Sequence, residues 1–230
     1  MSIRIAVISS MATKALLADL THQFQQAHPE IEVQVESVGG VDAAKRVQAG
    51  EAFDVVALAS DAIEKLVAAG HLLAETRVDI VRSAVAVAVP AGTPRPDIST
   101  EAALKAAVLA APTLGYSTGP SGVQLARLFE HWGIAAEIAP RIVTPPPGVP
   151  VGSLVAKGEV ALGFQQLSEL MNLPGITLLG GLPEAVQIVT TFSAAQTVPS
   201  TQTAATRSYL DFLASAATAA TKRQHGMEPA

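Results

Sequence analysis

The stretch VESVGGVDAAKRVQAGEAFDVVALAS, residues 35–60, contains the end of one predicted strand, a helix and a second strand. Its first residues complete an alternation of apolar and polar residues that is typical of a strand with one covered face. A helical pattern runs from about Val41 to Ala49 and ends at Gly50. The apolar run FDVVALAS then predicts a strand that is buried on both faces of a parallel sheet. Two strands joined by a helix indicate a crossover connection, and therefore an α/β protein.

The same pattern continues on both sides of this stretch. Before it, the apolar run IRIAVIS (3–9) predicts a strand. The helical pattern that follows from Thr13 ends at about His28, because Pro29 cannot continue a helix. After it, DAIEKLVAAG (61–70) predicts another helix. This part of the chain is therefore predicted to form a parallel sheet flanked by helices.

Two later segments predict that the chain crosses between two lobes. The apolar run VDIVRSAVAVAVP (78–90) ends in a segment rich in Pro and Gly, where we expect the chain to enter a second lobe. The run AVQIVTTFSAA (185–195) is interpreted as the strand that returns. The expected lobes are residues 1–85 with 190–230 for lobe 1, and residues 86–189 for lobe 2.

The composition excludes several functions. The 230 residues are 49% hydrophobic and 4% aromatic, which suits a core of Ala, Val, Leu and Ile. The net charge of -5 and the mixing of both signs provide no basic stripe for a phosphate backbone, so nucleic acid is not an expected partner. The absence of cysteine excludes disulfides and a cysteine nucleophile. The histidines lack metal-ligand spacing, so neither a metal site nor a cofactor is predicted.

The start of the sequence, MSIRIAVISSMATKALL, does not have the pattern of a secretory signal. It carries one arginine and a short, strand-like apolar run with no small-residue cleavage site. No stretch reaches the roughly 18 apolar residues that a membrane-spanning helix requires. We therefore expect no membrane insertion. The expected location is cytoplasmic for the chain as written, or periplasmic if a leader has been removed.

Four segments follow predicted strands and begin predicted helices. In an open parallel sheet, ligands bind beyond the carboxyl ends of the strands, where amide groups and the helix dipole favour an anion. The first three segments are expected to line one wall of a cleft, and the fourth the facing wall. The candidate ligand-binding residues are Ser9, Ser10 and Met11; Gly39, Gly40 and Val41; Ser60; and Thr118, Ser121 and Gly122.

Each segment also has a purely structural interpretation. Serines at strand ends are often helix caps, and Ser60 with Asp61 has the sequence of such a cap. Gly39 and Gly40 either permit a tight turn or let a ligand approach backbone amides. Ser121, in a turn that opens a helix, is the best anion cradle predicted for the second lobe.

Three stretches together carry a resemblance to a known family: GGVDAAKRVQAGEAFDVVALAS, LVAKGEVALGFQQLSEL and the ending YLDFLAS…KRQHGMEPA. The chain resembles type II periplasmic binding proteins, in the branch of molybdate-binding-like proteins. The resemblance implies two lobes, each a mostly parallel sheet flanked by helices, with a ligand cleft between them. It implies a small anionic ligand, and an ABC permease as partner if the protein is exported. Aconitate isomerases are similar to the same branch and interconvert trans- and cis-aconitate without a cofactor.

Differences from the molybdate-binding pattern bear on the ligand. The resemblance implies hydroxyl groups after the first and second strands and a tyrosine after the strand of GEVALG. A serine supplies the first hydroxyl here, but the second falls at Gly40 or Val41 and the tyrosine position at Gln166. Each oxygen of a buried oxyanion needs a donor. The pattern therefore favours a carboxylic acid, which the amides of Gln165 and Gln166 can bind.

Two classes of function stay open. The first, slightly favoured, is a substrate-binding or sensing protein that closes around an organic carboxylate or an oxyanion such as molybdate. The second is an isomerase that moves a proton within a tricarboxylate. The candidate bases for such a reaction are Lys14, Asp42 and Asp61. Further candidates for binding a ligand carboxylate are Arg82, a charge among valines, and Lys45 and Arg46, one turn into the helix after the glycine pair.

Overall fold

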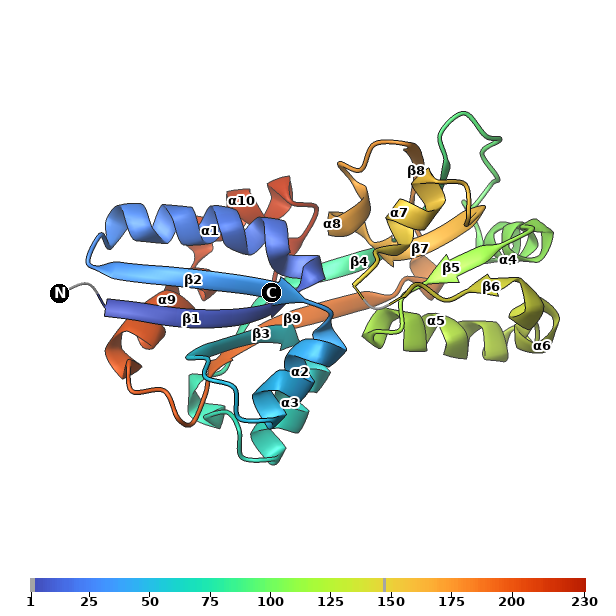
Figure 1. The fold of residues 1–230 in the computed structure, drawn as a ribbon. Helices are drawn as coiled ribbons and strands as arrows, with labels where there is room; N and C mark the ends of the chain where they lie inside the picture. Colours follow the sequence, from blue (N-terminus) through green and yellow to red (C-terminus); the bar gives the residue numbers. More distant parts are fainter. Residues whose placement is uncertain (1–2, 147) are drawn as a thin grey trace. The chain divides into compact units, whose positions relative to one another are not determined.

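The computed structural model describes residues 3–146 and 148–230. Strands and helices alternate through most of the chain, so the predicted α/β class is confirmed (Figure 1). The chain divides into two compact units, which we call unit 1 and unit 2. Unit 1 comprises Met1–Arg82 and Thr191–Ala230, and unit 2 comprises Ser83–Thr190.

Unit 1 is built on a sheet whose first three strands are parallel. Strand β1 lies between β2 and β3, with Ser10 opposite Val38 and Ser9 opposite Ala57. Strand β9 runs antiparallel to β3, and the short β10 pairs antiparallel with the first part of β4. These strands are β1 (Ile3–Ser10), β2 (Ile31–Val38), β3 (Val55–Ala59), β4 (Val78–Pro90), β9 (Val189–Gln196) and β10 (Glu228–Pro229).

Helices cover both faces of this sheet (Figure 1). Successive residues of a strand point to opposite faces, so Val55 packs with α1 and α9, while Val56 packs with α2 and α3. This explains why β3 is apolar throughout. The helices of unit 1 are α1 (Lys14–Ala27), α2 (Gly40–Gln48), α3 (Ser60–Ala68), α9 (Thr203–Ala214) and α10 (Ala219–Gln224).

Unit 2 combines parallel and antiparallel pairing. Strand β7 pairs in parallel with β5 and antiparallel with the second part of β4. Strand β6 continues the parallel pairing beyond β5, and β8 pairs antiparallel with β4. The strands are β5 (Leu114–Tyr116), β6 (Ile142–Val143), β7 (Leu162–Gln166) and β8 (Ile176–Gly181). The helices are α4 (Glu101–Ala110), α5 (Pro120–His131), α6 (Ala135–Ile138), α7 (Val151–Ala156) and α8 (Leu167–Leu170).

Strand β7 is buried on both faces, and its two faces differ. Phe164 packs in the cluster that contains residues of α4 and α5. Its neighbour Gln165 therefore points to the other face, which α7 covers, and Gln166 points to the same face as Phe164. Both glutamines are buried. This alternation gives two adjacent glutamines of one strand entirely different surroundings.

Candidate functional site

In unit 1, three helix starts lie along one edge of the sheet. Strands β1, β2 and β3 are parallel, so their carboxyl ends, at Ser10, Val38 and Ala59, meet at the same edge. The chain enters the 3-10 turn Met11–Thr13 before α1, and α2 and α3 begin directly after β2 and β3 (Figure 1). This is the edge at which open α/β sheets bind ligands.

The two serines at the end of β1 differ in the hydrogen-bond partners of their hydroxyl groups. The hydroxyl of Ser9 is fully buried and lies 2.7 Å from the hydroxyl of Ser37. The hydroxyl of Ser10 makes only a long contact of 3.4 Å with Thr13 Oγ1. Neither serine caps a helix by accepting from its first amides. Ser10 is therefore the better donor for a ligand, because the bond between Ser9 and Ser37 already occupies Ser9.

The backbone conformation does not require glycine at Gly39, which precedes α2, or at Gly40, the first residue of α2. Gly39 has φ -55 and ψ 135, which any residue can adopt, and Gly40 does not have a positive φ. The first amide bonded within the helix is that of Ala43, which donates to Gly39 O at 2.9 Å. A Cβ added to Gly40 would lie 3.7 Å from Ser10 Cβ. The lack of a side chain thus leaves space beside Ser10 and the first amides of α2.

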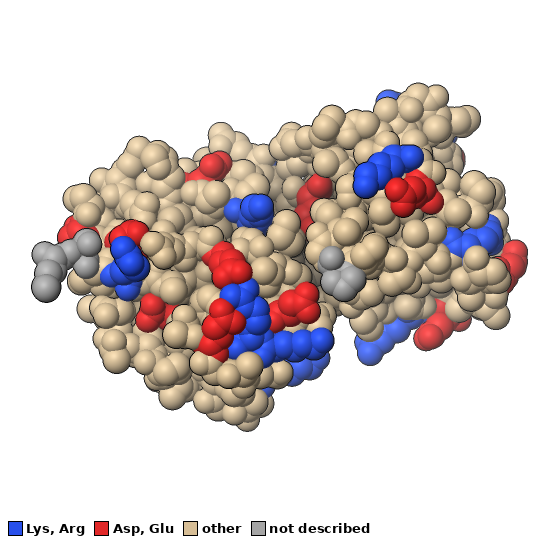
Figure 2. Space-filling view, viewed as in Figure 1, with Lys and Arg blue, Asp and Glu red and all other residues tan. Residues whose placement is uncertain are grey.

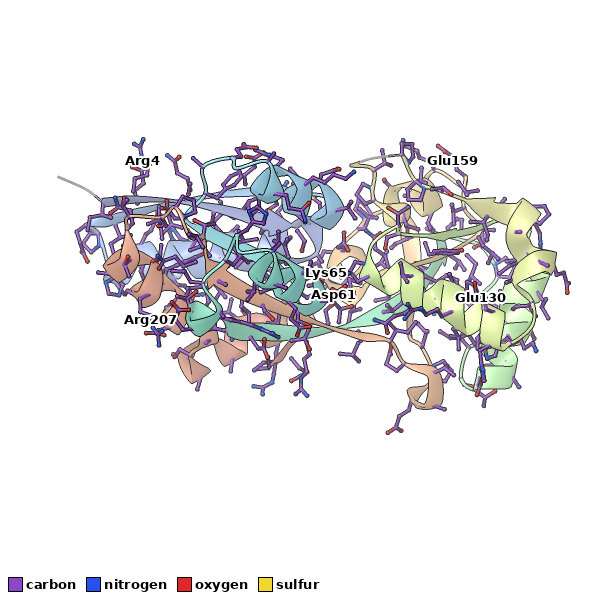
Figure 3. The ribbon with its side chains drawn as sticks, turned by 90° about the horizontal axis from the view of Figure 1, so that it is seen from below. Arg4, Asp61, Lys65, Glu130, Glu159 and Arg207 are labelled. Carbon is purple, nitrogen blue, oxygen red and sulfur yellow. The ribbon has the colours of Figure 1, made fainter. Side chains whose placement is uncertain are left out.

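The other acidic and polar candidates of unit 1 lie on the surface. Asp42 is exposed, and its Oδ2 would lie 3.3 Å from a Cβ added to Gly39. Ser60 is half-buried at the first position of α3. Asp61 is exposed, and its Oδ2 lies 3.6 Å from Lys65 Nζ along the same helix (Figure 3). Both aspartates lie in the first turn of a helix, where a negative charge interacts favourably with the positive end of the helix dipole.

The basic candidates also lie at the surface. Lys14, the first residue of α1, is exposed. Arg82 is exposed and donates to the backbone oxygen of Pro229 at 3.3 Å. Arg46 forms ion pairs with Glu36 and Glu51. The Arg46 guanidinium is therefore occupied by carboxylates of its own chain, whereas Lys14 forms no ion pair with a described residue.

In unit 2, α5 begins after the parallel strand β5. Pro120 has no N-H, and the first amide bonded within the helix is that of Val123, which donates to Gly119 O at 3.1 Å. The amides of Ser121 and Gly122 therefore have no acceptor within α5. The buried hydroxyl of Ser121 lies 3.3 Å from the hydroxyl of Ser117, which the sequence did not single out.

Gly122 is required by a close approach of the backbone. A Cβ added to it would lie 1.5 Å from the carbonyl oxygen of Ser117. Only glycine fits there, so the turn from β5 into α5 is fixed by this residue. Thr118, in the same turn, is exposed.

The two predicted glutamines have different roles. The Oε1 of Gln165 accepts from Gly152 N at 2.8 Å, and its Nε2 donates to Glu169 Oε1 at 2.7 Å. Gln165 therefore has both ends of its amide engaged by its own unit. The Nε2 of Gln166 donates to Thr190 Oγ1 at 2.9 Å, whereas its buried Oε1 has no partner among the described residues.

The unpartnered atom of Gln166 has a counterpart on the neighbouring strand. Ser83 Oγ is also buried without a partner among residues 3–146 and 148–230. Gln166 lies opposite Val85 in the antiparallel pair of β7 and β4, and Ser83 is two residues before Val85. Both side chains therefore point to one face of the sheet. Buried polar groups without partners are rare, and they mark places where a water or a ligand completes the bonding.

The amide of Gln166 can present either a donor or an acceptor. If it rotates by 180°, its Oε1 accepts from the Thr190 hydroxyl and its Nε2 becomes the unpartnered atom. The same side chain thus binds a carboxylate oxygen in one orientation and a hydroxyl or a protonated carboxyl group in the other. This behaviour suits an organic acid, as the sequence predicts.

Glu169 is a polar residue just beyond the carboxyl end of β7, and the sequence did not single it out. It lies on α8, which begins directly after β7. Burial raises the pKa of Glu169 to about 7, although the hydrogen bond from Gln165 acts in the opposite direction. The signal in the sequence, a glutamate one turn after a buried strand, is too common to be found without the structure.

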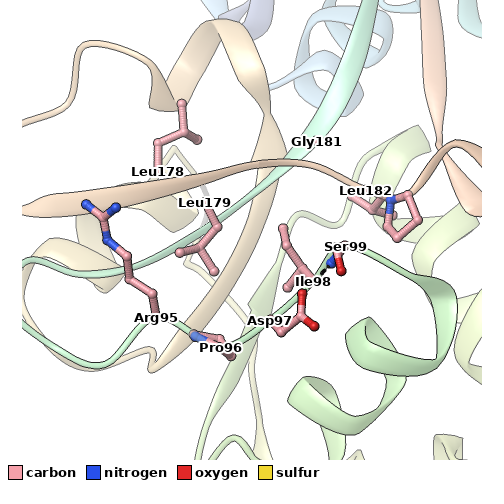
Figure 4. Close-up of a pocket in the computed structure, with 10 residues that line it drawn as sticks. Arg95, Pro96, Asp97, Ile98, Ser99, Leu178, Leu179, Gly181 and Leu182 are labelled. Carbon is pink, nitrogen blue, oxygen red and sulfur yellow. Dashed lines mark hydrogen bonds between the residues drawn. The ribbon is translucent and has the colours of Figure 1, made fainter.

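Two hollows occur within single units. In unit 2, a hollow of about 470 Å³ lies between residues 95–99 and strand β8 (Figure 4). In unit 1, a hollow of about 170 Å³ is lined by residues that include Val47, His71 and Val198. Neither contains a candidate residue. The candidate site is therefore defined by the helix starts and by the unpartnered buried atoms.

The described charged residues form neither a patch of one sign on the face in view nor a metal-ligand cluster. Figure 2 shows Lys and Arg mixed with Asp and Glu on the face in view. In the part of the chain that the structure describes, no three His, Cys, Asp or Glu residues gather as metal ligands. Among the same residues, no helix combines the length and apolar character that crossing a membrane requires.

The chain belongs to the family of bacterial extracellular solute-binding proteins, whose model matches residues 5–228. Among characterised relatives it is similar to aconitate isomerase from a Pseudomonas species. The two are 39% identical over 187 residues, which make up 80% of this chain and 70% of that protein.

Solved structures confirm the predicted type II periplasmic-binding-protein fold. The Azotobacter vinelandii periplasmic molybdate-binding protein has a TM-score of 0.80 at 19% identity, covering 97% of this chain and 98% of that one. The sulfate-binding protein of Mycobacterium tuberculosis has a TM-score of 0.78 at 15% identity, covering 99% and 87%. At these identities, the likeness concerns the fold alone.

Proposed function

We propose that the protein binds a small polycarboxylate and isomerises it by moving a proton from one carbon to another. The observation that carries this proposal is the 39% identity with aconitate isomerase over most of both chains. The molybdate-, tungstate- and sulfate-binding structures that share the fold are only 15–19% identical. The chain is thus much nearer to an isomerase of a tricarboxylate than to these binders of inorganic oxyanions.

The geometry of the helix starts supports an anion as the ligand. The first amides of α2 and α5 lack acceptors within their helices, and the positive ends of the helix dipoles coincide with them. Ser121 adds a hydroxyl donor at the start of α5, and Ser10, at the end of β1, adds one beside Gly40 of α2. That the two units share one ligand stays a prediction of the sequence.

Two further features support a carboxylic acid as the ligand. Gly40 places no side chain beside Ser10, so a ligand can approach the first amides of α2 there. Gln166 offers an amide that binds a carboxyl group in either protonation state. Neither position supplies the hydroxyl donor that the molybdate pattern implies.

Binding without catalysis is the second candidate function. The family match and the oxyanion-binding proteins of the same fold favour it. In that case the protein delivers or senses its ligand, and a transport permease is its expected partner. The ligand would leave the protein chemically unchanged.

Titration calorimetry with a panel of anions tests the ligand class. The panel contains trans-aconitate, cis-aconitate, citrate, simpler dicarboxylates, molybdate, tungstate and sulfate. We expect a tricarboxylate to bind at least about tenfold more tightly than any oxyanion. Proton NMR of the recovered ligands then shows whether either aconitate isomer has been converted into the other. Tighter binding of molybdate or sulfate would contradict the proposal.

Gly40→Ala is expected to separate stability from ligand binding. The backbone of Gly40 allows alanine, so we expect the variant to be equally stable or up to about 1 kcal/mol more stable. The added methyl group occupies the space beside Ser10, which should weaken tricarboxylate binding by about tenfold or more. Urea unfolding and calorimetry measure the two effects. Unchanged affinity would remove the start of α2 from the site.

Gln166→Glu is expected to weaken tricarboxylate binding by about tenfold or more, because a buried carboxylate would face the ligand's negative charge. Gln48→Glu is the matched control, since Gln48 is exposed at the end of α2. Calorimetry at pH 8 compares the two variants with the wild type. Equal affinities for both variants would show that Gln166 does not contact the ligand.

A further inference from the structure

Glu169 is held in a defined orientation at the carboxyl edge of unit 2. Its Oε1 accepts from Gln165 Nε2 at 2.7 Å, and Gln165 Oε1 accepts from the backbone amide of Gly152 at 2.8 Å. Gly152 is itself tightly packed, since a Cβ there would lie 2.6 Å from Leu173 Cδ2. The carboxyl group is therefore positioned by a chain of hydrogen bonds that starts at the backbone of α7.

The surroundings of this carboxyl group are those of a proton carrier. Glu169 lies on α8, one turn beyond the end of β7, on the side of the sheet to which its partner Gln165 points. Strand β5 ends at the same edge and leads into the start of α5. No basic residue of the described chain forms an ion pair with Glu169; burial raises its pKa, and the hydrogen bond from Gln165 lowers it by a smaller amount.

The protonation of Glu169 suits acid-base chemistry at neutral pH. Since its pKa is raised to about 7, both the acid and the carboxylate are populated there. A general acid-base group works best when its pKa lies near the operating pH.

We propose that Glu169 is the catalytic residue that carries the proton in the isomerisation, a step that rests on the proposed function. Its carboxylate removes a proton from the CH₂ carbon of the unsaturated tricarboxylate, and the electron pair of the broken C-H bond joins the adjacent double bond in an allylic carbanion. The carboxylic acid of Glu169 then returns the proton to the carbon at the other end of the allyl unit. The double bond has moved, Glu169 is a carboxylate again, and no oxidant or reductant is consumed.

The candidate bases from the sequence lack these features. Lys14 and Asp42 are exposed, and Asp61 is exposed beside Lys65. Water forms hydrogen bonds with an exposed base. It also exchanges with the proton that the base has removed, before that proton can return to the substrate. Glu169 is the half-buried alternative, with an orientation set by its neighbours.

The test compares Glu169→Gln with Glu159→Gln, a control at an exposed glutamate of the same unit (Figure 3). Glutamine retains the size of Glu169 and can still accept from Gln165, so the fold is preserved. For each protein, NMR follows trans-aconitate conversion and deuterium uptake in deuterated buffer, and calorimetry measures affinity. We expect Glu169→Gln to bind within about threefold of wild type and to lose at least about 100-fold in both reaction rates.

The pH profile provides a readout that a structural role would not change. Wild-type kcat/KM should show an inflection near pH 7 that is absent from the residual activity of Glu169→Gln. If Glu169→Gln converts the substrate at close to the wild-type rate, Glu169 is not the proton carrier and the proposed function still stands. If the wild type neither converts aconitate nor exchanges its protons, the proposed function fails and the role of Glu169 fails with it.

Discussion

Gly122→Ala is expected to destabilise unit 2 and to abolish tight binding of the anion. The added Cβ would lie 1.5 Å from Ser117 O and 2.7 Å from the Ser117 carbonyl carbon, so the backbone has to move. Overpacking against a fixed backbone costs about 1 to 3 kcal/mol or more. The movement also displaces the amides of Ser121 and Gly122 from their positions at the start of α5. Urea unfolding measures the loss of stability, and calorimetry with trans-aconitate measures the loss of affinity.

Gly119→Ala is the matched control for this variant. Gly119 precedes the same helix with φ -79, and a Cβ there would lie 3.7 Å from its nearest neighbour, Ser117 Oγ. We expect it to lose less than about 1 kcal/mol, as for an unfavourable residue at a helix cap. Equal stabilities for the two variants would contradict the close approach of Ser117 to Gly122.

Glu169→Gln is expected to raise the free energy of unfolding at pH 8 and to leave it nearly unchanged at pH 4. The folded protein raises the pKa of Glu169 from 4.5 to about 7, so between these values the folded state binds more protons than the unfolded state. The stability therefore falls as the pH rises through this window, by about 3 kcal/mol at most. Glutamine does not titrate, so the variant escapes this loss.

Urea unfolding of both proteins at pH 4, 6 and 8 measures this difference. The stability gap between variant and wild type should grow with pH and level off above pH 7. Glu159→Gln, at an exposed site, should follow the wild type throughout. A constant gap across the three pH values would show that Glu169 ionises in the folded protein as it does in the unfolded chain.

The expected gain in stability of Glu169→Gln and its expected loss of catalysis describe a conflict between stability and function at Glu169. A buried carboxyl group without a cationic partner costs stability once it ionises. The same environment produces the pKa that proton transfer at neutral pH requires. In the isomerase that we propose, the helix starts supply the anion site and one half-buried carboxyl group supplies the acid-base chemistry.

The main strands of the fold could be predicted because burial leaves a simple pattern in the sequence. Strand β3 is covered on both faces, and its residues are apolar throughout. The edge of unit 1 that carries the candidate helix starts followed from the parallel pairing of β1, β2 and β3. Short elements such as β6 and α8 have too few residues to show a period, and the sequence did not reveal them.

The side chains of the site could be predicted only in part. Gln165 and Gln166 are equivalent in the sequence, yet they point to opposite faces of β7 and only Gln166 has an unpartnered atom. Gly39 and Gly40 suggested a tight turn, whereas their backbone conformation suits any residue. Arg46 is paired with Glu36 and Glu51, and such pairing depends on tertiary contacts that periodicity does not encode.

The most direct test of the proposed isomerase activity is proton NMR of trans-aconitate incubated with the wild-type protein in deuterated buffer at pH 7. We expect cis-aconitate to appear and deuterium to enter the substrate carbons, with the protein present in far less than stoichiometric amounts. If calorimetry shows that trans-aconitate binds but its spectrum stays unchanged, the proposal of isomerase activity is contradicted. The protein then only binds its ligand.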